Sequence, residues 1–262
     1  MEAVQALKIE NLSIAFGGLR AVDDLSFHIE SGEIYGLIGP NGAGKTTAFN
    51  CITQFYLPNN GKVLFKTSDD KIVDLVGKKT HEIIKLGLVR TFQNVELIGD
   101  LSLLDNLLVG SHIKFKTGIF AQALRLKKAR IEEADIKQKA KEILNFLKIG
   151  DKKDELAGGQ PYGVLKKIEL GRTLMSNPKL IILDEPAAGL NDTETLELAK
   201  LIKSIRDEYK CTVLLVEHDM RLVMDICDRI CAISFGKKLA EGTPIQIQAN
   251  KDVQEAYLGR EE

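Results

Sequence analysis

The sequence predicts an α/β fold whose core is a buried, mostly parallel sheet. Continuous apolar runs, as opposed to alternating ones, are typical of strands covered on both faces. Three such runs occur, at Ile34–Ile38, Leu180–Leu183 and Thr212–Val216. Between the last two, apolar residues recur at helical spacing from position 198 to position 205. This order of strand, helix and strand predicts a right-handed parallel crossover.

An antiparallel β subdomain is expected on the N-terminal side of this core. Leu7–Ile14 and Ala21–Ile29 are predicted strands ahead of the first buried strand, which distinguishes the chain from a simple strand–helix–strand start. A hairpin is expected next, with strands at Gly61–Phe65 and Lys71–Leu75. A short helix at Thr80–Leu86 and a further strand at Leu88–Phe92 follow.

A helical insertion is expected in the middle of the chain. One apolar stripe at helical spacing predicts its long helix: Ile136, Ala140, Ile143, Leu144 and Leu147. The dense Lys and Arg residues between positions 114 and 153 favour a solvated helix face over contact with lipid headgroups or an acidic partner. After a helix at Lys166–Ser176, a closing hairpin at Ile230–Ser234 and Lys238–Ala240 is expected, and Pro244–Leu258 is predicted to form one short helix.

These elements divide the chain into four expected parts. Residues 1–93 would be the nucleotide-binding core with the antiparallel subdomain, and 94–165 the helical subdomain. Residues 166–243 would complete the core, and 244–262 would form the C-terminal helix and tail.

Composition narrows the classes of function. A chain of 262 residues with 44% hydrophobic residues suits one large domain or a core with an inserted subdomain. The net charge of −1 gives no electrostatic case for nucleic acid as the main partner. Since no signal peptide opens the chain and no apolar run reaches about 18 residues, we expect no membrane span. The four cysteines are expected to be reduced, buried thiols: Cys51, Cys211, Cys227 and Cys231.

A phosphate-binding loop is predicted directly after the first buried strand. Eight residues fit the pattern G-x-x-x-x-G-K-[ST]: Gly39, Pro40, Asn41, Gly42, Ala43, Gly44, Lys45 and Thr46. The glycines let successive backbone N–H groups turn inward around phosphates. Lys45 is expected against the β- and γ-phosphates and the Thr46 hydroxyl on Mg²⁺, while a helix at Thr47–Gln54 directs its N-terminal end at the phosphates. This context predicts that the chain binds ATP or GTP.

Polar residues end two of the buried strands at the edge where the loop lies. Asp184 is predicted to hold Mg²⁺ from the side opposite Thr46. Glu185 is predicted to orient a water molecule as general base. His218, at the end of the neighbouring strand, is predicted to contact the γ-phosphate and to hold the attacking water. With Lys45, these residues predict nucleotide hydrolysis.

The motifs resemble those of the ATPase subunits of ABC transporters, almost from end to end. Gly39–Thr46 resembles the Walker A loop, Leu180–Asp184 the Walker B strand and Ala188–Asn191 the D-loop, although Asn191 stands where an aspartate is usual. The resemblance implies a P-loop ABC ATPase with a RecA-like core, an antiparallel β subdomain and an inserted α-helical subdomain.

The same resemblance implies roles for single residues. Glu185 stands at the position of the catalytic glutamate and His218 at that of the switch histidine. Phe16, in the turn between the first two strands, falls where an aromatic side chain stacks on adenine, although an aromatic in a turn is more often a packing residue. Gln93 resembles the Q-loop glutamine, a ligand of Mg²⁺ or water, and Thr47 extends the nucleotide-binding set.

Longer strings are similar to the branched-chain amino-acid importer ATPases of the LivG type. These strings are more specific than the Walker motifs: Arg90–Asn94, Asp105–Gly110, Pro186–Asn191, Glu217–Met220 and Tyr257–Gly259. The resemblance implies a bacterial or archaeal importer of branched-chain, hydrophobic amino acids.

The signature motif, usually L-S-G-G-Q in this family, has two candidate registers. Leu156–Gln160 matches by composition, whereas the spacing to the Walker B strand favours Gln160–Val164. In the second register, which we prefer, Tyr162 and Gly163 would contact the γ-phosphate of a partner subunit's ATP. Pro161 has neither a hydroxyl nor an N–H to offer, so a weaker ATP-driven closure is a hypothesis.

The resemblance also implies partners and a location. Two ATPase subunits would face each other head to tail, as a homodimer or as a heterodimer with a second ATPase. A cleft beside Gln93 would receive a short helix of a membrane permease subunit, with Glu96, Leu97 and Ile98 nearby. The protein would lie at the cytoplasmic face of the inner membrane as a peripheral subunit, would act indirectly with a periplasmic or extracellular binding protein, and would bind no nucleic acid.

Three other functions share many of these motifs. Urea or amide importers and lipopolysaccharide exporters have similar ATPases, and the ATPase never touches the cargo. A soluble ABC ATPase acting on DNA or ribosomes is disfavoured because the chain has neither a long coiled coil nor a second such domain with a basic linker.

Overall fold

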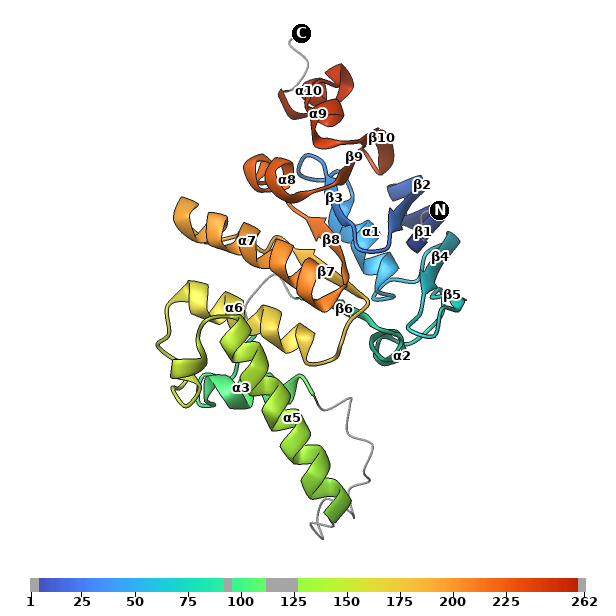
Figure 1. Ribbon diagram of the computed structural model, residues 1–262. Helices are drawn as coiled ribbons and strands as arrows, with labels where there is room; N and C mark the ends of the chain where they lie inside the picture. Colours follow the sequence, from blue (N-terminus) through green and yellow to red (C-terminus); the bar gives the residue numbers. More distant parts are fainter. Residues whose placement is uncertain (1–4, 92–95, 112–126, 259–262) are drawn as a thin grey trace. The chain divides into compact units, whose positions relative to one another are not determined.

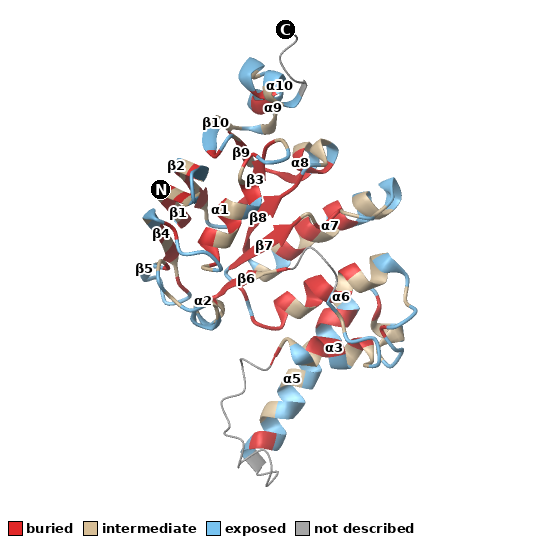
Figure 2. Cartoon of the chain, turned by 180° about the vertical axis from the view of Figure 1, so that it is seen from behind, coloured by how far each residue is buried: buried red, intermediate tan, exposed pale blue. Residues whose placement is uncertain are grey.

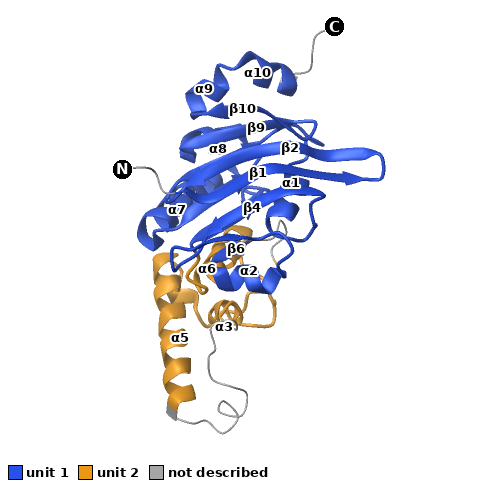
Figure 3. Ribbon diagram, turned by 90° about the vertical axis from the view of Figure 1, so that its right-hand side faces the viewer, with its two compact units in different colours: residues 1–90, 179–262 blue, residues 91–178 orange. Residues whose placement is uncertain are grey.

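The computed structural model describes residues 5–91, 96–111 and 127–258 of the chain. They belong to two compact units, shown in different colours in Figure 3: residues 1–90 with 179–262, and residues 91–178. The first unit holds two β-sheets and the helices that cover them, and the second is helical. The expected boundary at residue 165 falls inside a helix that belongs wholly to the second unit.

A six-stranded sheet in the order β10-β9-β3-β8-β7-β6 forms the centre of the first unit (Figure 1). Neighbouring strands from β9 to β6 are parallel, and β10 is antiparallel to β9. The strands are β3 (Ile34–Ile38), β6 (Leu88–Arg90), β7 (Leu180–Asp184), β8 (Thr212–Val216), β9 (Arg229–Ser234) and β10 (Lys237–Gly242).

The register of this sheet gathers the predicted site residues along one edge. Asp184 pairs with Val216, and Val216 pairs with Leu37 on its other side. The carboxyl ends of β3, β7 and β8 therefore coincide. Ligands of open parallel sheets bind at this edge, beyond the carboxyl ends of the strands.

A second sheet is antiparallel, in the order β2-β1-β4-β5. Its strands are β1 (Gln5–Phe16), β2 (Leu19–Glu30), β4 (Asn60–Lys66) and β5 (Ile72–Asp74). Apolar side chains from this sheet, from the six-stranded sheet and from the helix after β3 form one buried core. Figure 2 shows β3, β7 and β8 buried along their length, as their unbroken apolar sequences predict.

Three helices of the first unit correspond to predicted ones, at residues 45–52, 80–86 and 192–209, whereas the helix at residues 220–226 has no predicted counterpart. The helices of this unit are α1 (Lys45–Ile52), α2 (Thr80–Leu86), α7 (Asp192–Tyr209), α8 (Met220–Ile226), α9 (Pro244–Gln248) and α10 (Lys251–Leu258). The prediction of a single helix in the tail is wrong. Thr243 caps α9, but the Asn250 side chain accepts a hydrogen bond from the Val253 N–H at 3.1 Å and so starts a second helix.

The second unit packs α5 and α6 closely. Its elements are α3 (Leu103–Val109), α5 (Lys127–Phe146), η2 (Gly150–Lys152) and α6 (Tyr162–Leu174). A Cβ on Gly171 of α6 would lie 2.8 Å from the Leu147 side chain and 3.1 Å from Ile143, so this glycine permits the contact. Ile143, Leu144 and Leu147 are buried, which agrees with the predicted stripe.

Helices long and apolar enough to cross a membrane are absent from the described residues.

Candidate functional site

The loop between β3 and α1 depends on glycines at two close approaches. A Cβ on Gly39 would lie 2.3 Å from the Ile233 carbonyl oxygen, and one on Gly44 would lie 2.3 Å from the Ala21 carbonyl oxygen. Gly42 and Gly44 also have φ values of 80° and 99°, which side-chain-bearing residues rarely adopt. The backbone of the predicted phosphate loop therefore requires glycine at these positions.

Lys45 is held over the concave side of this loop. Its Nζ donates to the carbonyl oxygens of Gly39 and Pro40 at 2.7 and 3.1 Å. Burial lowers the pKa of Lys45, and the negative charges of Glu185 and Asp184 oppose this shift. The N–H groups of Lys45, Thr46 and Thr47, in the first turn of α1, have no intrahelical acceptor. A buried ammonium beside outward-facing N–H groups fits a polyphosphate.

Phe16 ends β1 with about half of its surface exposed. Its ring makes an edge-to-face contact with Tyr56, with the centroids 5.3 Å apart. Tyr56 follows α1, whose first turn belongs to the phosphate loop. An exposed aromatic pair in this part of the first unit offers a flat apolar surface of the kind that stacks on a nucleobase.

Asp184 lies at the end of β7 and is buried. Arg90, the last residue of β6, approaches it with Nη2 3.3 Å from Oδ2. Burial raises the pKa of Asp184, while the Arg90 charge lowers it. Arg90 is fixed by a 2.8 Å hydrogen bond to Asn50 Oδ1 and by the Phe49 ring, 4.2 Å from its guanidinium carbon. A carboxylate held at the edge beside the phosphate loop suits a Mg²⁺ ligand.

Glu185 and His218 meet at the same edge. The Glu185 Oε1 lies 3.7 Å from the His218 Nδ1, and the His218 side chain is exposed. Glu185 has a left-handed backbone, with φ at 45°, and its N–H donates to the Val216 carbonyl at 2.8 Å. The chain thus turns sharply after Asp184, so that two consecutive acidic side chains both belong to the edge.

Two residues with contacts in this site had no predicted role. Arg90 and Glu217 enter the sequence analysis only as the first residues of the segments Arg90–Asn94 and Glu217–Met220. The signal for Arg90 was a cation at the end of an apolar strand, and for Glu217 a carboxylate directly after a buried strand. Neither pattern identifies a partner in a distant segment, such as Asp184 for Arg90 or Ala187 for Glu217.

In the second unit, α6 begins at the later of the two signature registers. Pro161 is its N-cap, and Tyr162 is its first residue. Leu156 instead makes an isolated bridge with Ser102, and Gly159 has a φ of 91° in a turn. Exposed N–H groups at a helix start therefore belong to the Gln160–Val164 register, with no side-chain cap from Pro161.

Three further predictions concern Asn191, Gln93 and the four cysteines. Asn191 is the N-cap of α7: its side chain accepts from the Glu194 N–H, and the Glu194 carboxylate accepts from the Asn191 N–H, both at 3.0 Å. An amide at this position forms a capping box. Gln93 lies outside the described residues. All four cysteines are free and buried, as predicted.

Comparison with known proteins agrees with this geometry. A family model described as ABC transporter matches residues 22–188, and one described as branched-chain amino acid ATP-binding cassette transporter matches residues 237–262. The chain belongs to the ABC transporter family.

The relatives also confirm the resemblance to LivG-type proteins. The high-affinity branched-chain amino acid transport ATP-binding protein LivG of Escherichia coli K12 is 42% identical over 253 residues, covering 97% of each chain. The corresponding protein BraF of Pseudomonas aeruginosa has the same identity and coverage.

A solved structure confirms the predicted fold class. The ADP conformation of MJ1267, an ATP-binding cassette of an ABC transporter, superposes with a TM-score of 0.84. It is 32% identical in sequence and covers 98% of this chain and 100% of its own.

Proposed function

We propose that the chain is the ATP-binding and ATP-hydrolysing subunit of an ABC importer that takes up branched-chain amino acids through partner permeases. The observation that carries this proposal is the convergence of a phosphate loop, Asp184, Glu185 and His218 at one edge of the six-stranded sheet. The cargo class rests on the names of the LivG and BraF relatives and on the family model matched at residues 237–262.

ATP is the substrate of this site. The backbone N–H groups of Gly44, Lys45, Thr46 and Thr47 surround the phosphates, and Lys45 exchanges its two loop carbonyls for phosphate oxygens. Phe16 stacks on the adenine. The buried position of Lys45 supports this role, because a desolvated ammonium gains more from an anionic ligand than an exposed one.

The side chains at this edge fit Mg²⁺, a hard cation that prefers oxygen ligands. Thr46 and Asp184 would hold it, with Gln93 as the expected third contact. The ion supplies charge neutralisation for the phosphates.

Glu185 and His218 carry out the hydrolytic step. The Glu185 carboxylate takes the proton of the attacking water, whose oxygen forms the new bond to the γ-phosphorus as the bond to ADP breaks. His218 donates to the γ-phosphate and keeps the water in line. Their 3.7 Å separation supports a shared water or phosphate oxygen.

Two copies of the ATPase domain complete each site. The start of α6, with Tyr162 and Gly163, would meet the γ-phosphate bound by the partner subunit, because exposed helix N-termini attract phosphate. ATP binding closes the pair, hydrolysis opens it, and the Gln93 segment passes the change to a permease. The subunit would work at the cytoplasmic face of the membrane, as a homodimer or with a second ATPase.

Transport is tested by reconstituting the chain with permeases and a binding protein from the same source. ATP-dependent uptake of labelled leucine into proteoliposomes is expected, with urea as the competing cargo. Leucine uptake supports the proposal, whereas ATP-dependent uptake of urea alone contradicts the amino-acid assignment.

Dimer closure is tested by light-scattering chromatography of Glu185→Gln with Mg-ATP. We expect a dimer with ATP and a monomer without it. Pro161→Ser in the same background restores a hydroxyl at the N-cap of α6 and should increase the dimer fraction. A monomer in all conditions, with ATP binding shown separately, would contradict a homodimer.

A further inference from the structure

Glu217 is a buried carboxylate with no part in the steps above. It directly follows β8, and its exposed fraction is 0%. Within the described residues, the hydrogen bonds of its side chain come from backbone N–H groups, and its Oε2 also lies 3.7 Å from the His218 Nδ1. Oε1 accepts from Ala187 at 2.9 Å, and Oε2 accepts from His218 and Asp219 at 2.8 and 3.1 Å.

These three hydrogen bonds join two turns at the catalytic edge. Ala187 lies in the turn after β7, two residues beyond Glu185, whereas His218 and Asp219 lie in the turn between β8 and α8. One carboxylate therefore connects the chain that follows the general base to the chain that carries the switch histidine.

The connection is placed where the backbone of Glu185 needs support. With φ at 45°, Glu185 adopts a conformation that a residue with a side chain seldom keeps unless its surroundings hold it. Its own N–H is fixed by the Val216 carbonyl, and the Ala188 N–H returns to the Glu185 carbonyl at 3.1 Å. Ala187, between these two points, is fixed by Glu217.

We propose that Glu217 is a positioning residue for hydrolysis, which holds the Glu185 turn and the His218 turn in one arrangement. This inference rests on the proposed function, because it assigns Glu217 to the ATP-hydrolysing step. Among the described residues, the partners of the Glu217 side chain lie in these two turns and not in the phosphate loop, so its effect should belong to turnover and not to ATP affinity.

The main variant is Glu217→Gln, which keeps the shape but has one acceptor oxygen. Its amide NH₂ faces an N–H donor in either orientation, so one of the two turns loses its acceptor. We expect kcat for ATP hydrolysis to fall by about tenfold or more, since small misplacements of catalytic groups cost this much. The dissociation constant for ATP should change less than about twofold, within the context dependence of such measurements.

The matched control is Glu33→Gln on the opposite edge of the same sheet. Glu33 is also buried and also accepts a backbone N–H, from Glu30 at 2.7 Å, with Arg229 nearby at 3.4 Å. Its loss should lower the melting temperature and leave kcat unchanged. Glu217→Asp keeps the charge but is shorter by one methylene, so it should release Ala187 and reduce kcat as Gln does.

All variants are assayed well below their melting temperatures, with ATP binding measured separately from phosphate release. If Glu217→Gln or Glu217→Asp folds and keeps the wild-type kcat, or if both lower kcat only as much as Glu33→Gln does, the inference is overturned. If Glu217→Asp has the wild-type kcat while Glu217→Gln does not, the charge of residue 217 matters and the joining of the two turns does not. This result also overturns the inference. Failure of the wild-type protein to hydrolyse ATP would instead contradict the proposed function.

Discussion

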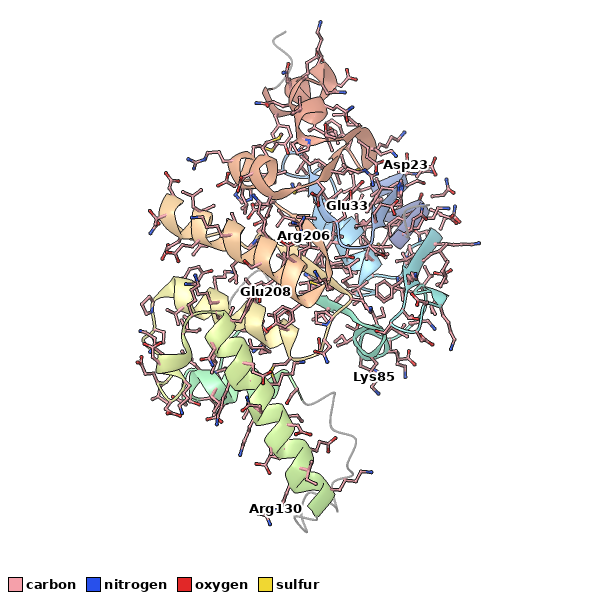
Figure 4. All side chains as sticks on the ribbon, in the orientation of Figure 1. Asp23, Glu33, Lys85, Arg130, Arg206 and Glu208 are labelled. Atoms are coloured by element: carbon pink, nitrogen blue, oxygen red, sulfur yellow. The ribbon has the colours of Figure 1, made fainter. Side chains whose placement is uncertain are left out.

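The two edges of the six-stranded sheet both contain buried acidic residues, but they neutralise them differently. At the amino edge, Glu33 and Glu241 share Arg229, and the Tyr35 hydroxyl donates to Glu241 at 2.8 Å. Asp228 accepts from the Ile34 N–H at 2.8 Å and from Arg206 at 3.3 Å. Glu33 and Arg206 are labelled in Figure 4. This edge therefore holds two sets of ion pairs, one around Arg229 and one around Arg206.

At the carboxyl edge, backbone N–H groups do most of this work. Glu217 is held by three of them, and Asp184 has the Arg90 guanidinium at 3.3 Å. Burial raises the pKa of both Asp184 and Glu33. The contrast is clearest between Glu33, which has the Arg229 cation at 3.4 Å, and Glu217, which accepts from three backbone N–H groups beside the catalytic turns.

The largest expected effect comes from Asp184→Asn. Removing the carboxylate that would hold Mg²⁺ should reduce ATP hydrolysis by about a hundredfold or more, because a bound metal ion contributes several kcal/mol to the transition state. Phosphate release over a Mg²⁺ titration measures it. Asp228→Asn, at the other edge, should leave the rate unchanged, and equal losses from both variants would remove the distinction between the edges.

A smaller effect is expected from Lys45→Ala. Loss of its charge-assisted contacts should weaken ATP binding by about tenfold to a hundredfold. Lys237→Ala is the control, since Lys237 is an exposed lysine of the same unit that pairs with Asp23 at 3.2 Å. Titration calorimetry with ATP compares the two. Unchanged affinity in Lys45→Ala would show that the loop does not bind phosphate.

Arg229→Ala should affect stability and not turnover. It leaves buried Glu33 without its cation and leaves half-buried Glu241 with Lys238 alone, which should cost about 3 kcal/mol of the free energy of unfolding in urea. The folded-state pKa of Glu33 is already raised and should rise further, so the folded variant binds the extra proton. The loss in free energy of unfolding of Arg229→Ala, relative to the wild type, should therefore be smaller at pH 4.5 than at pH 7.5. A deficit that is independent of pH would argue against this network.

The smallest effect is expected in the reactivity of the buried thiols of α1 and β9. Burial raises the pKa of Cys51, on α1, to about 11 and that of Cys231, on β9, to about 12. At pH 8 both are protonated as well as buried, so neither should react with iodoacetamide in the native protein. Mass spectrometry before and after unfolding in urea measures this. Native labelling of Cys51 alone would show that α1 opens more readily than β9.

Much of the first unit could be predicted because its signals are local. Ile34–Ile38, Thr80–Leu86 and Thr212–Val216 have the predicted bounds, and continuous apolar runs define the two strands among them. The Walker residues could also be predicted, because their motif is contiguous and its strand precedes it directly.

The rest depends on contacts between distant segments. Nothing near Glu217 in the sequence indicates that its carboxylate accepts from Ala187, thirty residues earlier, and the same holds for Arg90 and Asp184. The sequence predicts one helix in the tail, whereas the cap formed by the Asn250 side chain starts a second helix at Lys251.

Single-turnover hydrolysis by Glu185→Gln tests the central claim, that the carboxyl edge carries out the chemistry, most directly. The variant is mixed in excess over labelled Mg-ATP, and bound ATP and released phosphate are followed together. The account predicts wild-type binding with hydrolysis slowed by about a hundredfold or more, since a general base contributes at least that factor. Hydrolysis at the wild-type rate would contradict it and would place the general base elsewhere.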